Sequence, residues 1–115
     1  MRGLFKSFSH ATRGIIYAFK EERNFQIEVI VAILVLFLMV LYPLTAIERS
    51  LLLVMIAFVL TMELLNTCFE RMLDMLKPHV HPYVKVIKDL VAGAVLLASA
   101  FAFIVGLLIF LPFLV

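Results

Sequence analysis

The chain has 115 residues, 65% of them hydrophobic, and a formal net charge of only +2. A mean hydropathy of +1.17 excludes an ordinary water-soluble domain and indicates an integral membrane protein. The small charge, without interleaved basic and aromatic residues, argues against nucleic-acid binding. The single cysteine, Cys68, excludes an internal disulfide.

Residues 1–24 have the pattern of an amphipathic helix. One face carries Leu4, Phe5, Phe8, Ala11, Ile15, Ile16 and Phe19, and the opposite face carries Arg2, Lys6, Arg13 and Lys20. This pattern predicts a helix that lies in the membrane interface. Charge is spread over the segment and no small-residue cleavage site follows, so a removable signal peptide is not expected.

Three apolar runs follow, at residues 27–44, 51–69 and 90–114. Each is close to or above the roughly 20 residues that a transmembrane helix needs, and no linker or repeat divides the chain. The third run repeats a small residue every four positions (Ala94, Ala98, Ala102, Gly106), which allows another helix to approach closely. The expected fold is a single all-α membrane domain, residues 1–115, with three spans and an interfacial helix.

The basic residues predict the orientation. Five precede the first span, four occur between the second and third spans, and the loop between the first two spans has only Arg49. By the positive-inside rule, the N-terminus and the loop around residues 71–88 are cytoplasmic and the C-terminus is outside.

Polar residues form a stripe along the second span: Glu63, Asn66, Thr67, Glu70 and Asp74. At about 100° per residue, all five fall within about 60° of Glu63 around the helix. A carboxylate at membrane depth costs on the order of 2.5–3.5 kcal/mol, so it marks a functional candidate. The stripe is therefore the predicted active site, and a buried polar network that only fixes helix packing is the competing interpretation.

The depth of these side chains suggests their chemistry. Glu63 lies roughly 20 Å from the outer end of its span, in the cytoplasmic third of the bilayer, and Glu70 lies about 10 Å nearer the cytoplasm. A carboxylate beside a membrane substrate is a plausible general base, and Asn66 could hold it or a substrate hydroxyl. Glu70 and an acid from the Glu21–Glu22 pair could bind Mg²⁺.

Groups suited to a nucleotide begin the third span, where Lys88 could bind phosphate and Asp89 a hydroxyl or an amine. The sequence has no Walker A motif, so a kinase would hold phosphates with metal and polar side chains. His79 and His81 lie in the preceding loop, where solvated histidines are more common than metal ligands.

Three motifs resemble the small integral-membrane diacylglycerol kinase family of bacteria, which includes the undecaprenol kinases. They are YAFKEERNFQIE at 17–28, ELLNTCFERMLD at 63–74 and KDLVAGAVLLA at 88–98. The resemblance covers nearly the whole chain. It implies a homotrimer in the bacterial cytoplasmic membrane, with active sites shared between subunits.

The resemblance also implies residue roles. Glu63 matches a general base that deprotonates the lipid hydroxyl as it attacks the γ-phosphate of ATP, and Asn66 matches an active-site asparagine. The remaining matches are Glu22 and Glu70 with magnesium ligands, His81, Lys88 and Asp89 with nucleotide contacts, and Glu28 and Arg49 with the surroundings of the lipid.

The acceptor suggested by the resemblance is undecaprenol, with diacylglycerol as the alternative. The chain lacks tryptophan and carries Ala92 where an enterobacterial branch of the family has serine, so it is more similar to the Gram-positive branch of undecaprenol kinases.

Two other functions fit a small membrane protein with a buried glutamate. A proton-coupled multidrug transporter would not require the stripe to continue to Glu70 and Asp74. A non-catalytic assembly subunit would tolerate replacement of Glu63 and Asn66.

Overall fold

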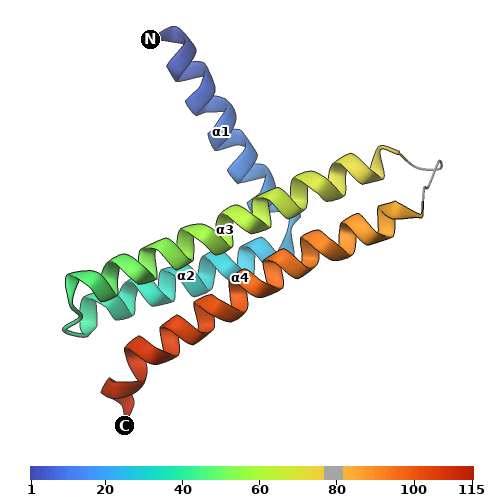
Figure 1. Cartoon of the computed structure of the whole chain (residues 1–115). Coiled ribbons are helices and arrows are strands. Elements are labelled where there is room, and N and C mark those ends of the chain that lie inside the picture. Colours follow the sequence, from blue (N-terminus) through green and yellow to red (C-terminus); the bar gives the residue numbers. More distant parts are fainter. Residues whose placement is uncertain (77–81) are drawn as a thin grey trace.

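The computed structural model describes residues 1–76 and 82–115, which form four helices. They are α1 (Arg2–Glu21), α2 (Arg23–Leu41), α3 (Ala46–Asp74) and α4 (Tyr83–Leu114). Helices α2, α3 and α4 pack as a bundle in which α3 contacts both of the others, and α1 projects away from it (Figure 1). The last three helices are long and apolar enough to cross a membrane, which confirms the predicted all-helical class with three spans.

The helices do not end where their hydrophobicity ends. The first apolar run, residues 27–44, lies mainly in α2, which begins at Arg23 and ends at Leu41, and α3 and α4 begin before the second and third runs, at Ala46 and Tyr83. The N-terminal helix ends at Glu21 rather than at residue 24, because Glu22 has extended backbone angles (φ −115°, ψ 111°) that turn the chain into α2. A helix can extend through polar residues as long as its backbone hydrogen bonds continue. The ends of an apolar run therefore do not give the ends of the helix.

The turn between α2 and α3 has a clear local cause. Pro43 disfavours a helical conformation at Tyr42, which is extended, so α2 ends at Leu41. Thr45 then begins α3 with a capping box: its hydroxyl accepts a hydrogen bond from the Glu48 amide (3.1 Å), and the Glu48 carboxylate accepts one from the Thr45 amide (2.9 Å).

This end of the bundle is closed by apolar packing. Met39, Leu44, Leu52 and Ile109 form a buried cluster that joins all three spans. The Tyr42 ring lies against Phe110 and Phe113 of α4, with ring centroids 6.0 and 5.2 Å apart. These contacts fix the positions of the helices at the end of the molecule away from the polar stripe.

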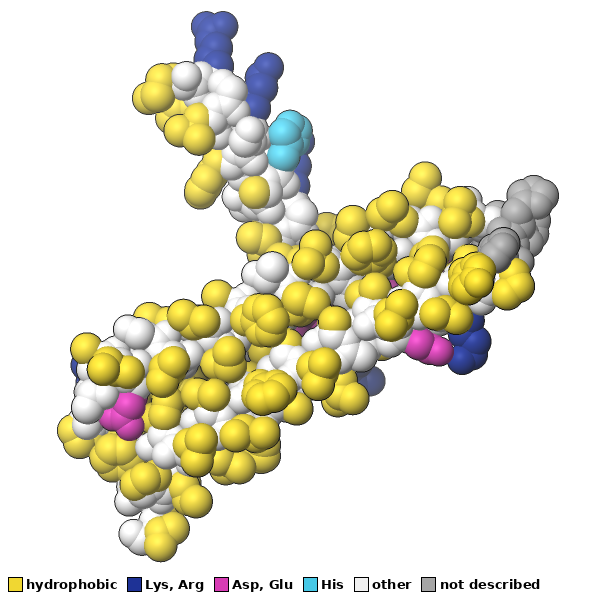
Figure 2. Space-filling view, viewed as in Figure 1, with side chains coloured by type: hydrophobic (Ala, Val, Ile, Leu, Met, Phe, Trp, Pro, Cys, Tyr) yellow, Lys and Arg dark blue, Asp and Glu magenta, His cyan; other side chains and the backbone are white. Residues whose placement is uncertain are grey.

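Helix α1 presents an unpartnered apolar face. Its large apolar side chains are exposed along one side, and its basic side chains lie along another (Figure 2). Phe8, for example, is 74% exposed although it lies on the predicted apolar face. An amphipathic helix of this kind buries its apolar face in the lipid interface.

The spans differ in length, and this difference positions the polar residues. At 1.5 Å per residue, α2 is about 28 Å long, whereas α3 and α4 are about 44 and 48 Å. The α3–α4 pair therefore continues beyond the corner at which α1 meets α2 (Figure 1). The corner lies beside the middle of the pair, next to the polar stripe of α3.

Replacement of Thr45 tests the start of α3. Thr45→Ala removes the side-chain acceptor of the capping box and should lower the free energy of unfolding by about 1 kcal/mol, whereas Thr45→Ser should retain it. Unfolding in mixed detergent micelles measures the change. Equal stability of the alanine and serine variants would contradict a functional cap.

Candidate functional site

The site is built around Glu63, in the middle of α3. Its side chain is only 2% exposed, and Thr67, one turn further along, is 5% exposed. Among the described residues these are the buried polar side chains, in a bundle whose other buried residues are apolar. A carboxylate is rarely buried without a functional or structural reason, since its desolvation is costly.

The predicted stripe is connected by hydrogen bonds within α3. The Thr67 hydroxyl donates to the Glu63 backbone carbonyl (3.1 Å). Its proton is therefore bonded to the backbone and not to the Glu63 carboxylate. The Asn66 amide nitrogen donates to the Glu70 carboxylate (3.3 Å), and the Asn66 side chain also interacts with Glu63. Asn66 therefore connects the buried acid to the acid one turn beyond it.

Helix α2 brings a second acid to Glu63. The Glu28 and Glu63 carboxyl groups interact across the α2–α3 interface. Among the described residues, the Glu28 oxygen Oε2 is buried and has no hydrogen-bond partner. A buried acceptor without a donor is costly, and it could receive the hydroxyl of a bound alcohol. The association of Glu28 with the lipid stays a prediction.

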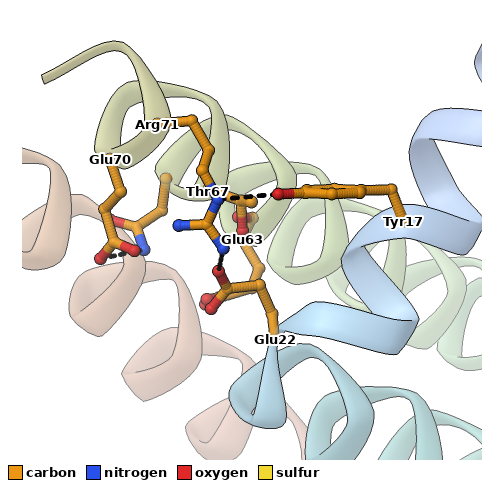
Figure 3. Close-up of polar contacts among 7 residues, drawn as sticks. Tyr17, Glu22, Glu63, Thr67, Glu70 and Arg71 are labelled. Atoms are coloured by element: carbon orange, nitrogen blue, oxygen red, sulfur yellow. Dashed lines mark hydrogen bonds and ion pairs between the residues drawn. The ribbon is translucent and has the colours of Figure 1, made fainter. Parts of the chain in front are cut away.

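The corner between α1 and α2 brings Glu22 to the same site. Its charge acts on Glu63, as does that of Glu70. Figure 3 shows the Glu22 carboxylate turned toward α3, where it accepts a hydrogen bond from Arg71 Nη2 (2.6 Å). Arg71 Nε also donates to the Tyr17 hydroxyl of α1 (2.9 Å).

Arg71 and Tyr17 are not among the site residues that the sequence predicts. The sequence indicates Arg71 only as one of the basic residues that set the orientation. Its helical spacing was an available signal, since Arg71 follows Thr67 by one turn and therefore lies beside the stripe. The position of Tyr17, 54 residues away, depends on the turn at Glu22 and could not be deduced from spacing.

The predicted nucleotide residues lie further along the α3–α4 pair. Lys88 Nζ is 3.6 Å from the Asp74 carboxylate, which is about 16 Å from Glu63 along α3. Asp89 accepts a hydrogen bond from Lys85 (3.1 Å), and both of these side chains are exposed. His81 lies outside the described residues.

Arg49 is not brought to the site. It is exposed in the first turn of α3, about 30 Å from Glu70 along the helix. The predicted association of Arg49 with the lipid therefore requires contact with a distant part of a long substrate.

An apolar cavity of about 410 Å³ lies between the three spans. Glu28 and Ser99 contribute polar side chains to a lining that is otherwise mainly aliphatic and aromatic. Ala102 and Gly106 of the small-residue repeat also line it, so part of this repeat leaves space rather than closing a helix contact. The cavity places hydrocarbon-sized space directly beside the Glu28–Glu63 pair.

The donor set suits magnesium better than zinc or calcium. Glu22 and Glu70 supply carboxylates, and Mg²⁺ in proteins commonly takes one or two of these together with substrate phosphates. In the part of the chain that the structure describes, no group of three or more acidic, histidine or cysteine side chains forms a complete metal site. The residues fit an ion that arrives with a phosphate ligand.

Fold and site together define a small multi-pass helical membrane protein, with a buried carboxylate cluster between an apolar cavity and a polar end. The sequence profile of the prokaryotic diacylglycerol kinase family matches residues 9–110. The chain belongs to this family and is a lipid kinase. ATP is the phosphate donor that this membership implies.

Two relatives show the range of the family. The chain is 43% identical over 108 residues to an undecaprenol kinase of Bacillus subtilis, covering 94% of this chain and 88% of the relative. It is 39% identical over 110 residues to a diacylglycerol kinase of Synechocystis, covering 95% of this chain and 63% of that longer protein.

Replacement of Asn66 tests the link between Glu63 and Glu70. Asn66→Ala removes the donor to Glu70 and the contact with Glu63, and we expect kcat to fall on the order of 10²-fold, as for other groups that orient a catalytic acid or base. The control is Ser50→Ala, which removes an exposed hydroxyl that donates to a carbonyl of the same helix (2.8 Å). Similar kcat values for the two folded variants would contradict a role for Asn66.

Proposed function

We propose that the protein transfers the γ-phosphate of ATP to the primary hydroxyl of undecaprenol, in a magnesium-dependent reaction at the cytoplasmic face of the bacterial membrane. The burial of Glu63 between the apolar cavity and the polar end of the α3–α4 pair carries this proposal. A lipid alcohol approaches Glu63 from the cavity side, and the nucleotide approaches from the polar end.

Glu63 acts as the general base in this scheme. Its carboxylate takes the proton from the lipid hydroxyl as that oxygen forms a bond to the γ-phosphorus. The bond from the γ-phosphorus to the bridging oxygen breaks, and ADP leaves with that electron pair. Glu28 lies beside Glu63 and lines the cavity from which the alcohol approaches, and Asn66 orients Glu63. Positioning of the reactants supplies much of the rate enhancement.

Glu22 and Glu70 are the residues that would hold Mg²⁺. When bound, the ion supplies charge neutralisation for the phosphates. Both carboxylates lie close enough for their charges to act on Glu63, which supports a shared site. Lys88 and Asp89 contact the nucleotide further along the α3–α4 pair, and His81, which lies outside the described residues, is the third proposed nucleotide contact.

The proposed orientation places α1 and residues 71–88 in the cytoplasm. The excess of basic residues in these two regions supports it. We also propose a homotrimer with active sites shared between subunits. One chain leaves much of its apolar surface exposed and its carboxylates enclosed by only three thin helices, and neighbouring copies would complete the enclosure.

The choice of undecaprenol rests on the relative that has the higher sequence identity and coverage. The Bacillus relative, an undecaprenol kinase, is covered over 88% of its length, against 63% for the Synechocystis diacylglycerol kinase. The cavity is apolar over most of its lining and accommodates hydrocarbon of either kind.

A parallel assay tests the acceptor. Purified protein in mixed micelles receives radiolabelled ATP, Mg²⁺ and either undecaprenol or diacylglycerol, and kcat/KM is compared. A larger value for undecaprenol is expected. A larger value for diacylglycerol would overturn the acceptor but leave the lipid kinase, whereas no lipid product from either alcohol would overturn the proposed reaction.

Glu63→Gln tests the general base. The amide keeps the size of the side chain but accepts a proton poorly, so turnover should be lost while the protein remains folded and binds nucleotide. Glu48→Gln is the matched control on the same helix, because glutamine also completes a capping box. Near-normal turnover by Glu63→Gln would exclude the base assignment.

A further inference from the structure

We propose that Arg71 is a positioning residue for catalysis: held by Tyr17 of the interfacial helix, it aims the Glu22 carboxylate at the magnesium site. The inference rests on the proposed magnesium role of Glu22. It assigns a function to two side chains that the reaction scheme itself does not use.

The first step concerns the freedom of Glu22. Its backbone is fixed at the corner, where its amide donates to the Ala18 carbonyl (2.9 Å) and its own carbonyl accepts from the Gln26 amide (3.1 Å). Its side chain makes no capping hydrogen bond to α2. A glutamate side chain in an open corner has many rotamers, so another group must select one of them.

Arg71 can select one rotamer of Glu22, because its guanidinium donates two hydrogen bonds at once. Nη2 donates to Glu22 Oε1 (2.6 Å) and Nε donates to the Tyr17 hydroxyl (2.9 Å), as Figure 3 shows. The guanidinium carbon also lies 5.8 Å from the centre of the Tyr17 ring. Because the guanidinium is rigid and planar, fixing one nitrogen restricts the direction of the other.

The exposure of the pair argues against a purely structural role. The Arg71 and Glu22 side chains are 40% and 17% exposed, and an ion pair with one partner so open to solvent adds little stability. The same hydrogen bond can still affect function by fixing the orientation of a carboxylate that binds a metal ion. Hydrogen-bond partners of metal-binding carboxylates commonly change metal affinity or activity 10- to 100-fold when removed.

The arrangement also connects α3 to the corner between α1 and α2. Arg71 is the residue after Glu70 in α3, and its side chain reaches across to Glu22 at the end of α1. Tyr17 belongs to α1, whose apolar face is free to enter the lipid interface. The contact thus couples the position of the interfacial helix to the geometry of the metal site.

The experiment measures metal binding directly, with Mn²⁺ in place of Mg²⁺. Binding of Mn²⁺ to the full protein, with a non-hydrolysable ATP analogue, is followed by electron paramagnetic resonance. Arg71→Met should raise the Kd for Mn²⁺ about tenfold or more, and the Mg²⁺ concentration for half-maximal activity should rise in parallel. The KM for the lipid should stay unchanged.

Two further variants separate positioning from charge. Arg71→Lys keeps the charge but lacks the rigid fork, so it should also raise the Kd. Tyr17→Phe removes only the hydroxyl that holds Arg71 and should raise the Kd by a smaller factor, which keeps a test available if Arg71→Met does not fold. Lys20→Met is the control, since it removes an exposed cation from the last turn of α1.

The outcomes are distinguishable. An unchanged Kd in Arg71→Met and Tyr17→Phe, with an increase in Glu22→Gln, would overturn the positioning role alone. A lower Kd in Arg71→Met would show that Arg71 competes with the metal and would also overturn it. An unchanged Kd in Glu22→Gln would remove Glu22 from the metal site, and both the magnesium assignment and this inference would fall.

Discussion

A single buried carboxylate, Glu63, constrains the organisation of this protein. Burying an acid in an apolar bundle costs free energy that packing alone does not return, so neighbouring groups must offset it. Glu28 of α2 and Asn66 of α3 provide hydrogen bonds to its side chain, whereas Glu22, at the corner between α1 and α2, brings a like charge within range of it.

The unequal lengths of the spans give this cluster its two environments. Helix α2 ends at the corner, while α3 and α4 continue beyond it and carry polar residues such as Asp74 and Lys88. On the other side of Glu63 the three spans line an apolar cavity that is partly open. A site between hydrocarbon and a polar surface suits a reaction between a membrane alcohol and a water-soluble nucleotide, and the family to which the chain belongs performs that chemistry.

Much of the fold followed from hydropathy and helical periodicity. The length of the apolar runs predicts three spans, and the charged and apolar faces of the first 24 residues predict the separate N-terminal helix. The helix ends were harder to predict, because they depend on local events such as the extended backbone at Glu22 and the capping box at Thr45. Periodicity does not detect either of these.

The candidate site, like the fold, could be predicted from the sequence only in part. Glu63, Asn66 and Glu70 lie on one helix, so their spacing predicts their shared face. Contacts between helices, such as Glu28 with Glu63 and Tyr17 with Arg71, depend on the turn at the corner and on the packing of α2 against α3. The roles matched to Glu22 and Glu28 came from the family resemblance, and the structure adds the contacts that could carry them out.

The most direct test of the central claim is a structure of the protein in a lipid nanodisc with undecaprenol and a non-hydrolysable ATP analogue. We expect the lipid hydroxyl within hydrogen-bond reach of the Glu63 carboxylate, at about 3 Å, with the γ-phosphate on the far side of the hydroxyl oxygen. A hydroxyl bound elsewhere, with Glu63 facing only protein groups, would contradict the role of Glu63 as general base.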